Sequence, residues 1–84
     1  MDRFNLKNYL SKINEYSVIN FAKNYNIHLS FVEANQGLYF LKTHFDQLLN
    51  CYDKKEYIYY YLQDPFAYKM YVLINILIEK LKIY

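Results

Sequence analysis

The end of this sequence holds its clearest helix-start signal, followed by its most apolar stretch. Asp64 precedes Pro65, and an acidic residue followed by proline is typical of a helix start, because proline has no N–H to leave unpaired there. Apolar residues then recur at three- and four-residue spacing, which predicts a helix from Pro65 to about Lys82. A helix that is apolar on more than one face must be covered on more than one side.

Two apolar stripes run along this helix, and a chain of 84 residues has a thin core with which to cover them. We therefore expect a second copy of the chain to cover part of the segment from Pro65 to Tyr84, which would make the protein a homodimer. The candidate interface also includes two tyrosines from the segment before it. Its residues are Phe66, Met70, Val72, Leu73, Ile76, Leu77, Leu81, Ile83, Tyr57 and Tyr61.

Two shorter helices are predicted near the start of the chain. Apolar residues at helical spacing indicate the first, at about residues 5–12. Asn14 is a suitable N-cap for the second, at about residues 15–25, because its side-chain oxygen can accept a hydrogen bond from a free N–H of the first turn. Asn26 follows, and asparagine suits the left-handed conformation that ends many helices.

A capping box marks the start of a third helix. In Ser30-Phe31-Val32-Glu33, the serine hydroxyl can accept the glutamate N–H while the carboxylate accepts the serine N–H. Apolar residues continue the helical pattern through Leu41 towards Phe45. The sequence leaves open whether residues 43–49 continue this helix.

The tyrosine-rich segment that follows admits two interpretations. Taken alone, Tyr57-Ile58-Tyr59-Tyr60-Tyr61-Leu62 favours a strand, because Tyr and Ile have high strand propensity. The segment lies between two helix starts, at Asp53 with Glu56 and at Asp64-Pro65, so a short helix is predicted instead. We expect residues 1–84 to form one all-α domain, a small bundle of four or five helices with a long apolar C-terminal helix.

Composition argues against several functional classes. The chain has one Gly, so it offers no glycine-rich phosphate loop. Its formal charge of +2 shows no concentrated basic character. The most apolar stretch, Met70 to Ile78, falls well short of the roughly 20 residues that span a membrane. The start of the chain does not resemble a signal peptide, and the single cysteine cannot form an intrachain disulfide, so we expect a cytoplasmic protein.

One segment resembles the YqfT-like family of small uncharacterised proteins from Gram-positive bacteria. The resemblance covers roughly residues 11–82, and its specific part runs from Ile13 to Ala34. The matching residues are Ile13-Asn14, Ala22-Lys23, Tyr25, Ile27, Leu29-Ser30, Glu33-Ala34 and, more loosely, Pro65 with Lys69. The tyrosine run and the strongly apolar last helix depart from the family pattern. The resemblance implies an all-α bacterial protein and carries over no activity or catalytic residue.

Residues 18–42 could form a DNA-binding helix-turn-helix, which is the alternative to a protein-interaction function. The candidate contacts lie on the second helix of this hairpin, and Asn and Gln side chains can pair with adenine edges. They are Phe31, Asn35, Gln36 and Lys42. The helix has one positive charge before Thr43, and Glu33 would face phosphate, so nucleic-acid binding is not favoured.

The sequence indicates neither a metal site nor a catalytic one. His28 and His44 are far apart in sequence and belong to no metal-ligand motif. Cys51 with either histidine could form a nucleophile only with a third residue to orient the base, and no such residue is indicated. We predict no cofactor and no enzymatic activity.

The four tyrosines between residues 57 and 61 are the remaining candidate surface. On a helix, Tyr57 and Tyr61 share one face, while Tyr59 and Tyr60 point elsewhere. They can be core on one face and ordinary exposed residues on the other, a partner-binding surface, or a base-stacking platform with Lys54 and Lys55. We predict an interaction or regulatory protein that self-associates, with an unidentified protein as a further possible partner.

Overall fold

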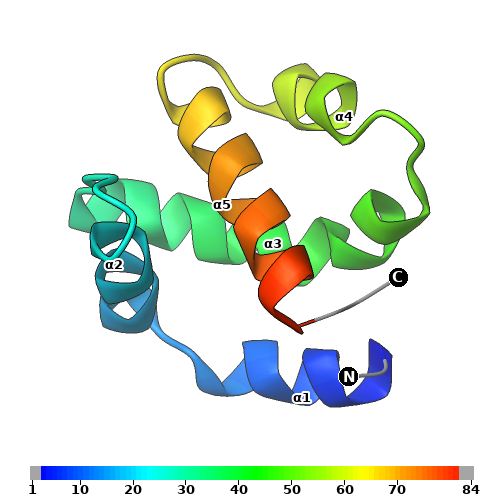
Figure 1. Cartoon of the computed structure of the whole chain (residues 1–84), viewed down its shortest axis with the longest axis horizontal. Helices are drawn as coiled ribbons and strands as arrows, with labels where there is room; N and C mark the ends of the chain where they lie inside the picture. Colours follow the sequence, from blue (N-terminus) through cyan, green and yellow to red (C-terminus); the bar gives the residue numbers. More distant parts are fainter. Residues whose placement is uncertain (1–2, 82–84) are drawn as a thin grey trace. The chain divides into compact units, whose positions relative to one another are not determined.

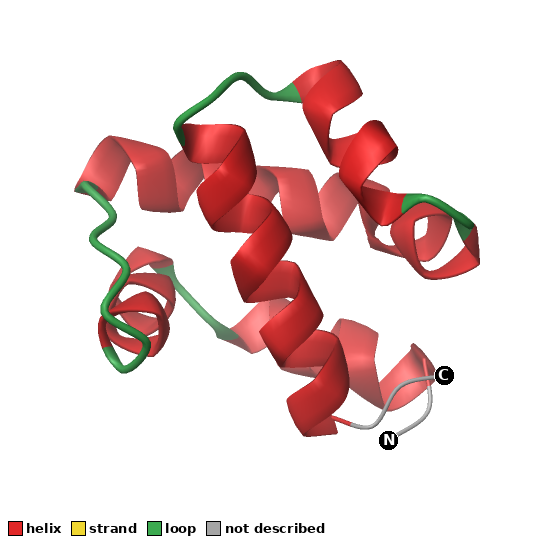
Figure 2. Ribbon diagram, turned by 45° about the horizontal axis from the view of Figure 1, so that its top comes forward, coloured by secondary structure: helices red, strands yellow, loops and turns green. Residues whose placement is uncertain are grey.

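The structure of the chain is a computed structural model, which describes the backbone of residues 3–81 and the side chains of residues 8–80. The described residues form five helices and no strand (Figures 1 and 2). The all-α prediction is therefore confirmed. The helices are α1 (Arg3–Lys12), α2 (Glu15–Lys23), α3 (Phe31–Asn50), α4 (Lys54–Tyr61) and α5 (Phe66–Leu81).

The chain divides into two compact units. Among the described residues, one unit contains residues 3–43 and the other contains residues 44–81. Helix α3 is continuous across this division, which resolves the question left open for residues 43–49: they are helical. Whether the whole chain acts as one domain stays a prediction.

Side-chain caps start α2 and α3 where the sequence predicts them. The Asn14 side chain accepts the Ser17 N–H at 3.0 Å, and the Ser17 hydroxyl lies 3.5 Å from the Asn14 N–H. At α3, the Ser30 N–H donates to the Glu33 carboxylate at 3.0 Å, and the Glu33 N–H donates to the Ser30 hydroxyl at 3.1 Å. The predicted capping box of α3 is thus confirmed, and a cap of this kind contributes about 1 kcal/mol.

The turn after α2 has the left-handed residue that the sequence predicts there. Asn26 has φ 61°, its N–H donates to the Lys23 carbonyl at 3.0 Å, and the Ile27 N–H donates to the Ala22 carbonyl at 3.0 Å. These two hydrogen bonds close the helix end in the pattern known as the Schellman motif. The assigned helix ends at Lys23, two residues before the predicted end at Tyr25, and the intervening residues form the turn.

In the second unit, α4 and α5 begin close to the predicted caps. Asp53 caps α4 by accepting the Glu56 N–H at 3.0 Å. Helix α5 begins at Phe66, one residue later than predicted, because the Pro65 carbonyl already accepts the Lys69 N–H at 3.3 Å and so occupies the capping position. The Asp64 carboxylate still accepts a first-turn N–H, that of Tyr68, at 3.1 Å.

The apolar stripe of α5 is buried to a greater extent than its sequence indicates. Met70, Leu73 and Leu77 are 1%, 5% and 9% exposed. Phe66, Val72 and Ile76 are half-buried. The side chain of Leu81 and all of Lys82, Ile83 and Tyr84 lie outside the described residues. Of the large apolar or aromatic side chains described on α5, the exposed one is Tyr68.

Candidate functional site

The tyrosine run forms helix α4, and one buried side chain fixes its orientation. Ile58 is fully buried, and α4 packs against α5 within the second unit. The ammonium of Lys55, an exposed residue of α4, lies 5.8 Å from the ring centroid of Tyr59 on α4 and 5.8 Å from that of Tyr71 on α5. Each contact is a cation–π interaction, which at a partly exposed site contributes about 0.5–1 kcal/mol.

Two of the tyrosines stack with a histidine from the last turns of α3. Tyr57 and Tyr61 lie one helical turn apart, with ring centroids separated by 5.2 Å. The His44 Nδ1 atom and the Tyr57 hydroxyl form a 2.9 Å hydrogen bond, and the His44 ring lies 4.6 Å from that of Tyr61. In the sequence, His44 is a candidate only for metal binding or catalysis, and its pairing with Tyr57 is missed because the two residues are 13 positions apart.

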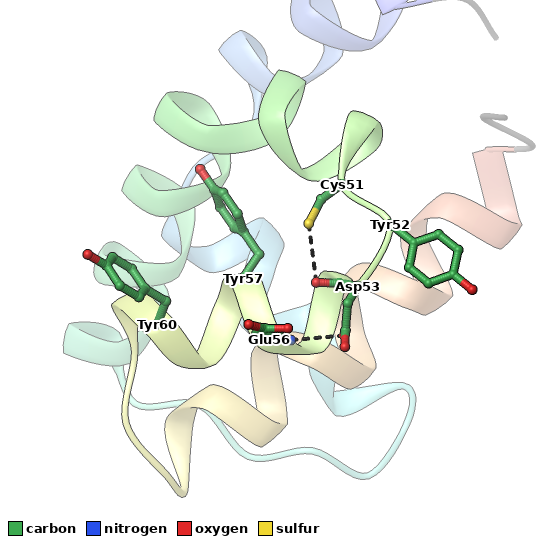
Figure 3. A pocket seen from close by; sticks show the side chains of 6 residues that line it. All are labelled: Cys51, Tyr52, Asp53, Glu56, Tyr57 and Tyr60. Atoms are coloured by element: carbon green, nitrogen blue, oxygen red, sulfur yellow. Dashed lines mark hydrogen bonds between the residues drawn. The ribbon is translucent and has the colours of Figure 1, made fainter.

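A shallow hollow of about 450 Å³ lies at the start of α4 (Figure 3). In Figure 3, Tyr57 and Tyr60 extend to one side of it and Tyr52 to the other, with the two acidic side chains between them. Tyr52 is 104% exposed relative to the reference residue and Tyr60 is 81% exposed, while Tyr57 is half-buried. We call this site the tyrosine hollow; it is lined by Cys51, Tyr52, Asp53, Glu56, Tyr57 and Tyr60.

Hydrogen bonds hold the loop that forms one wall of the tyrosine hollow. The Cys51 thiol donates to the Asp53 carbonyl at 3.2 Å, and the Lys54 ammonium donates to the Cys51 carbonyl at 3.3 Å. One carboxylate oxygen of Asp53 is engaged in capping α4. These hydrogen bonds connect the loop to the first turn of α4. The side chains of the tyrosine hollow therefore project from an ordered backbone.

Two tyrosines of α4 hold their protons more tightly than an ordinary tyrosine. Burial raises the pKa of Tyr57 above its usual 10.0, and the neighbouring Tyr61 and Cys51 raise it further. Burial also raises the pKa of Tyr59, and the Asp64 side chain adds to this shift through a hydrogen bond and its negative charge. Both phenols therefore remain neutral donors through the physiological range.

The residues proposed for nucleic-acid contact lie on one exposed stretch of α3. Phe31 is 51% exposed, and Asn35, Gln36 and Lys42 are also exposed. The Asn35 amide donates to the Glu15 carboxylate at 3.1 Å, so an adenine edge would have to displace that bond. The Phe31 ring lies 5.7 Å from that of Tyr16.

The connection before α3 also differs from that of a helix-turn-helix. Residues 24–30 separate α2 from α3, seven positions in all, whereas the DNA-binding motif uses a turn of about three or four residues. A second hollow, of about 410 Å³, lies at this connection and is lined by Ile19, Lys23, Asn26, Ile27, His28 and Leu29. The connection at residues 24–30 is thus longer than the turn of a DNA-binding helix-turn-helix. The exposed surface of α3 also lacks the concentration of basic residues that contact with DNA phosphates requires.

The described residues offer neither a metal site nor a membrane span. No group of three or more His, Cys, Asp or Glu residues among them is arranged to hold a metal ion. None of the described helices combines the length and the apolar character that crossing a membrane requires.

Comparison of the chain with protein families, with curated proteins and with solved structures finds no match. The resemblance to the YqfT-like family therefore stays a prediction.

Proposed function

We propose that this chain is a small protein-interaction module, which binds a partner protein through the tyrosine hollow. The observation that carries the proposal is the exposure of Tyr52 and Tyr60 at the two sides of a shallow hollow. Tyrosine is enriched at interaction hot spots, because its ring supplies a large contact area with few rotatable bonds and its hydroxyl can still form a hydrogen bond.

The contacts that hold α4 in place favour a binding role for its exposed tyrosines. Asp53 caps the helix, Ile58 anchors it, and the His44–Tyr57 hydrogen bond joins it to the end of α3. An ordered surface loses less conformational entropy when a partner binds, so more of the contact energy appears as affinity.

Self-association through α5 is a second part of the proposal. It is supported by the half-buried apolar side chains Phe66, Val72 and Ile76. The available surface is smaller than the sequence indicates, because Met70, Leu73 and Leu77 are already buried. Sedimentation equilibrium tests it: the wild-type chain should associate, and Ile76→Glu should shift it towards the 10.4 kDa monomer. A concentration-independent wild-type monomer would rule this part out.

Photo-crosslinking tests the main proposal even while the partner is unidentified. The photoreactive residue p-benzoylphenylalanine replaces Tyr52 or Tyr60 in the native host, and Tyr39, which is 70% exposed on α3, serves as the control position. We expect the same discrete adduct from positions 52 and 60 and none from 39. Adducts of equal yield at all three positions, or none at any, would refute the proposal.

The proposal also includes a cellular compartment, and nucleic-acid binding is its alternative. We place the protein in the cytoplasm, where the thiol of the free Cys51 would stay reduced. We propose no enzymatic role.

A titration with duplex DNA at low salt tests the nucleic-acid alternative, since binding by phosphate contacts would weaken steeply as salt is added.

A further inference from the structure

We infer that the tyrosine hollow receives an arginine side chain of the partner protein, an assignment that rests on the proposed function. The charge of the lining is the first argument. Among the six lining residues, Asp53 and Glu56 are acidic and none is basic. The structure gives the Glu56 carboxylate no hydrogen bond or ion pair with any described side chain.

The lysines that follow the cap do not line the hollow. Lys54 directs its ammonium to the Cys51 carbonyl at 3.3 Å, and Lys55 places its ammonium over Tyr59 and Tyr71. Neither is among the residues that line the site. A cation from a partner can therefore approach the two carboxylates from the open side of the hollow.

The tyrosine rings favour arginine among the cationic side chains. A guanidinium group is planar, so it can stack on an aromatic face and at the same time donate two parallel hydrogen bonds to a carboxylate. Tyr57 and Tyr60 line the hollow together with Glu56 (Figure 3), and Tyr60 is 81% exposed. A lysine ammonium is a compact, strongly hydrated charge and uses this combination less well. A volume of about 450 Å³ accommodates such a side chain with the neighbouring backbone.

Short blocked peptides test the assignment by NMR. The probe is acetyl-Ala-Arg-Ala-Arg-Ala-amide, and its controls replace both arginines by citrulline, which has the same shape and no charge, or by lysine. We expect the arginine peptide to shift the amide signals of residues 51–60 and to bind at least threefold more tightly than the lysine peptide. The citrulline peptide should cause no shift at the same concentration.

Two substitutions and two matched controls locate the binding site. Glu56→Gln should weaken arginine-peptide binding about fivefold, and Tyr60→Ala about threefold, as expected for one charge-assisted hydrogen bond and one exposed cation–π contact. Glu79→Gln removes an exposed charge on α5, and Tyr39→Ala removes an exposed ring on α3, so both should leave binding unchanged. Circular dichroism verifies that all four variants fold.

The outcomes separate this inference from the function on which it rests. Equal shifts with the arginine and citrulline peptides, equal affinity for arginine and lysine, or an unaltered affinity after Glu56→Gln would each overturn the arginine assignment. If such a result accompanies a discrete adduct at positions 52 and 60, the interaction function stands and only the partner chemistry is wrong. If the adduct itself is missing, the function is wrong.

Discussion

Helices α4 and α5 belong to the same unit and are both rich in apolar and aromatic residues, yet they differ in where those side chains lie. On α5, Met70 and Ile74 are almost fully buried. On α4, Ile58 is buried in the same way, whereas Tyr60 and Tyr61 are 81% and 49% exposed. Apolar content alone therefore does not identify an interaction surface: Met70, Ile74 and Ile58 belong to the core, whereas Tyr60 and Tyr61 remain exposed.

The physical reason lies in the two kinds of side chain. Burying a large aliphatic side chain gains about 1.5–3 kcal/mol and leaves no polar atom unpaired. A buried tyrosine needs a partner for its hydroxyl, and in α4 such a partner is shown for Tyr57, in His44. At an exposed position such as that of Tyr60, water or a binding partner can complete the hydrogen bonds of the hydroxyl.

The sharpest test of this contrast is a pair of truncations. Met70→Ala should lower the free energy of unfolding by about 2–5 kcal/mol, because it leaves a cavity in a fully buried position. Tyr60→Ala should change it by less than about 0.5 kcal/mol. Urea denaturation followed by circular dichroism measures both. Equal losses would mean that Tyr60 belongs to the core and that α4 and α5 do not differ as described.

The cap of α4 provides the next test, since the tyrosine hollow depends on this helix start. Asp53→Ala should cost about 1 kcal/mol of stability, because it leaves the Glu56 N–H without its 3.0 Å acceptor. Asn caps helices as well as Asp, so Asp53→Asn should remain within about 0.5 kcal/mol of the wild type. Thermal unfolding of the wild type and the two variants measures these differences in stability. A loss in the Asn variant equal to that in the Ala variant would assign the effect to charge and not to the cap.

How much can be predicted from the sequence depends on the range of each interaction. The caps at Asn14, Ser30 and Asp53 are predictable, because each joins groups three residues apart. The helical state of residues 43–49 is not, because no cap or breaker marks either outcome. Tyr57 is identified as a candidate, but its pairing with His44 is not, since the two meet only when α3 and α4 are folded.

Removing the hydrogen bond between Tyr57 and His44 should lower the free energy of unfolding by less than Met70→Ala does. Tyr57→Phe deletes the hydroxyl of the 2.9 Å bond to His44 and retains the ring, so we expect a loss of about 0.5–1.5 kcal/mol. Tyr39→Phe, at a position that is 70% exposed, should leave stability unchanged. The difference between these two variants in urea denaturation measures what the Tyr57 hydroxyl contributes to stability. No difference would show that the Tyr57 hydroxyl, and with it the bond to His44, contributes nothing to stability.

The smallest expected effect concerns the ionisation of two tyrosines of α4, Tyr57 and Tyr59, at alkaline pH. The pKa values of Tyr57 and Tyr59 are raised above 10.0, mainly by burial. A raised pKa means that the folded chain holds these protons after the unfolded chain has lost them. The two tyrosines therefore contribute full stability below pH 10, and the contribution falls as the pH rises through their folded-state values. Phenolate absorbance should show a late-ionising fraction that shrinks in Tyr57→Phe and in Tyr59→Phe. A late-ionising fraction that is unchanged in both variants would show that neither Tyr57 nor Tyr59 holds its proton more tightly than an ordinary tyrosine.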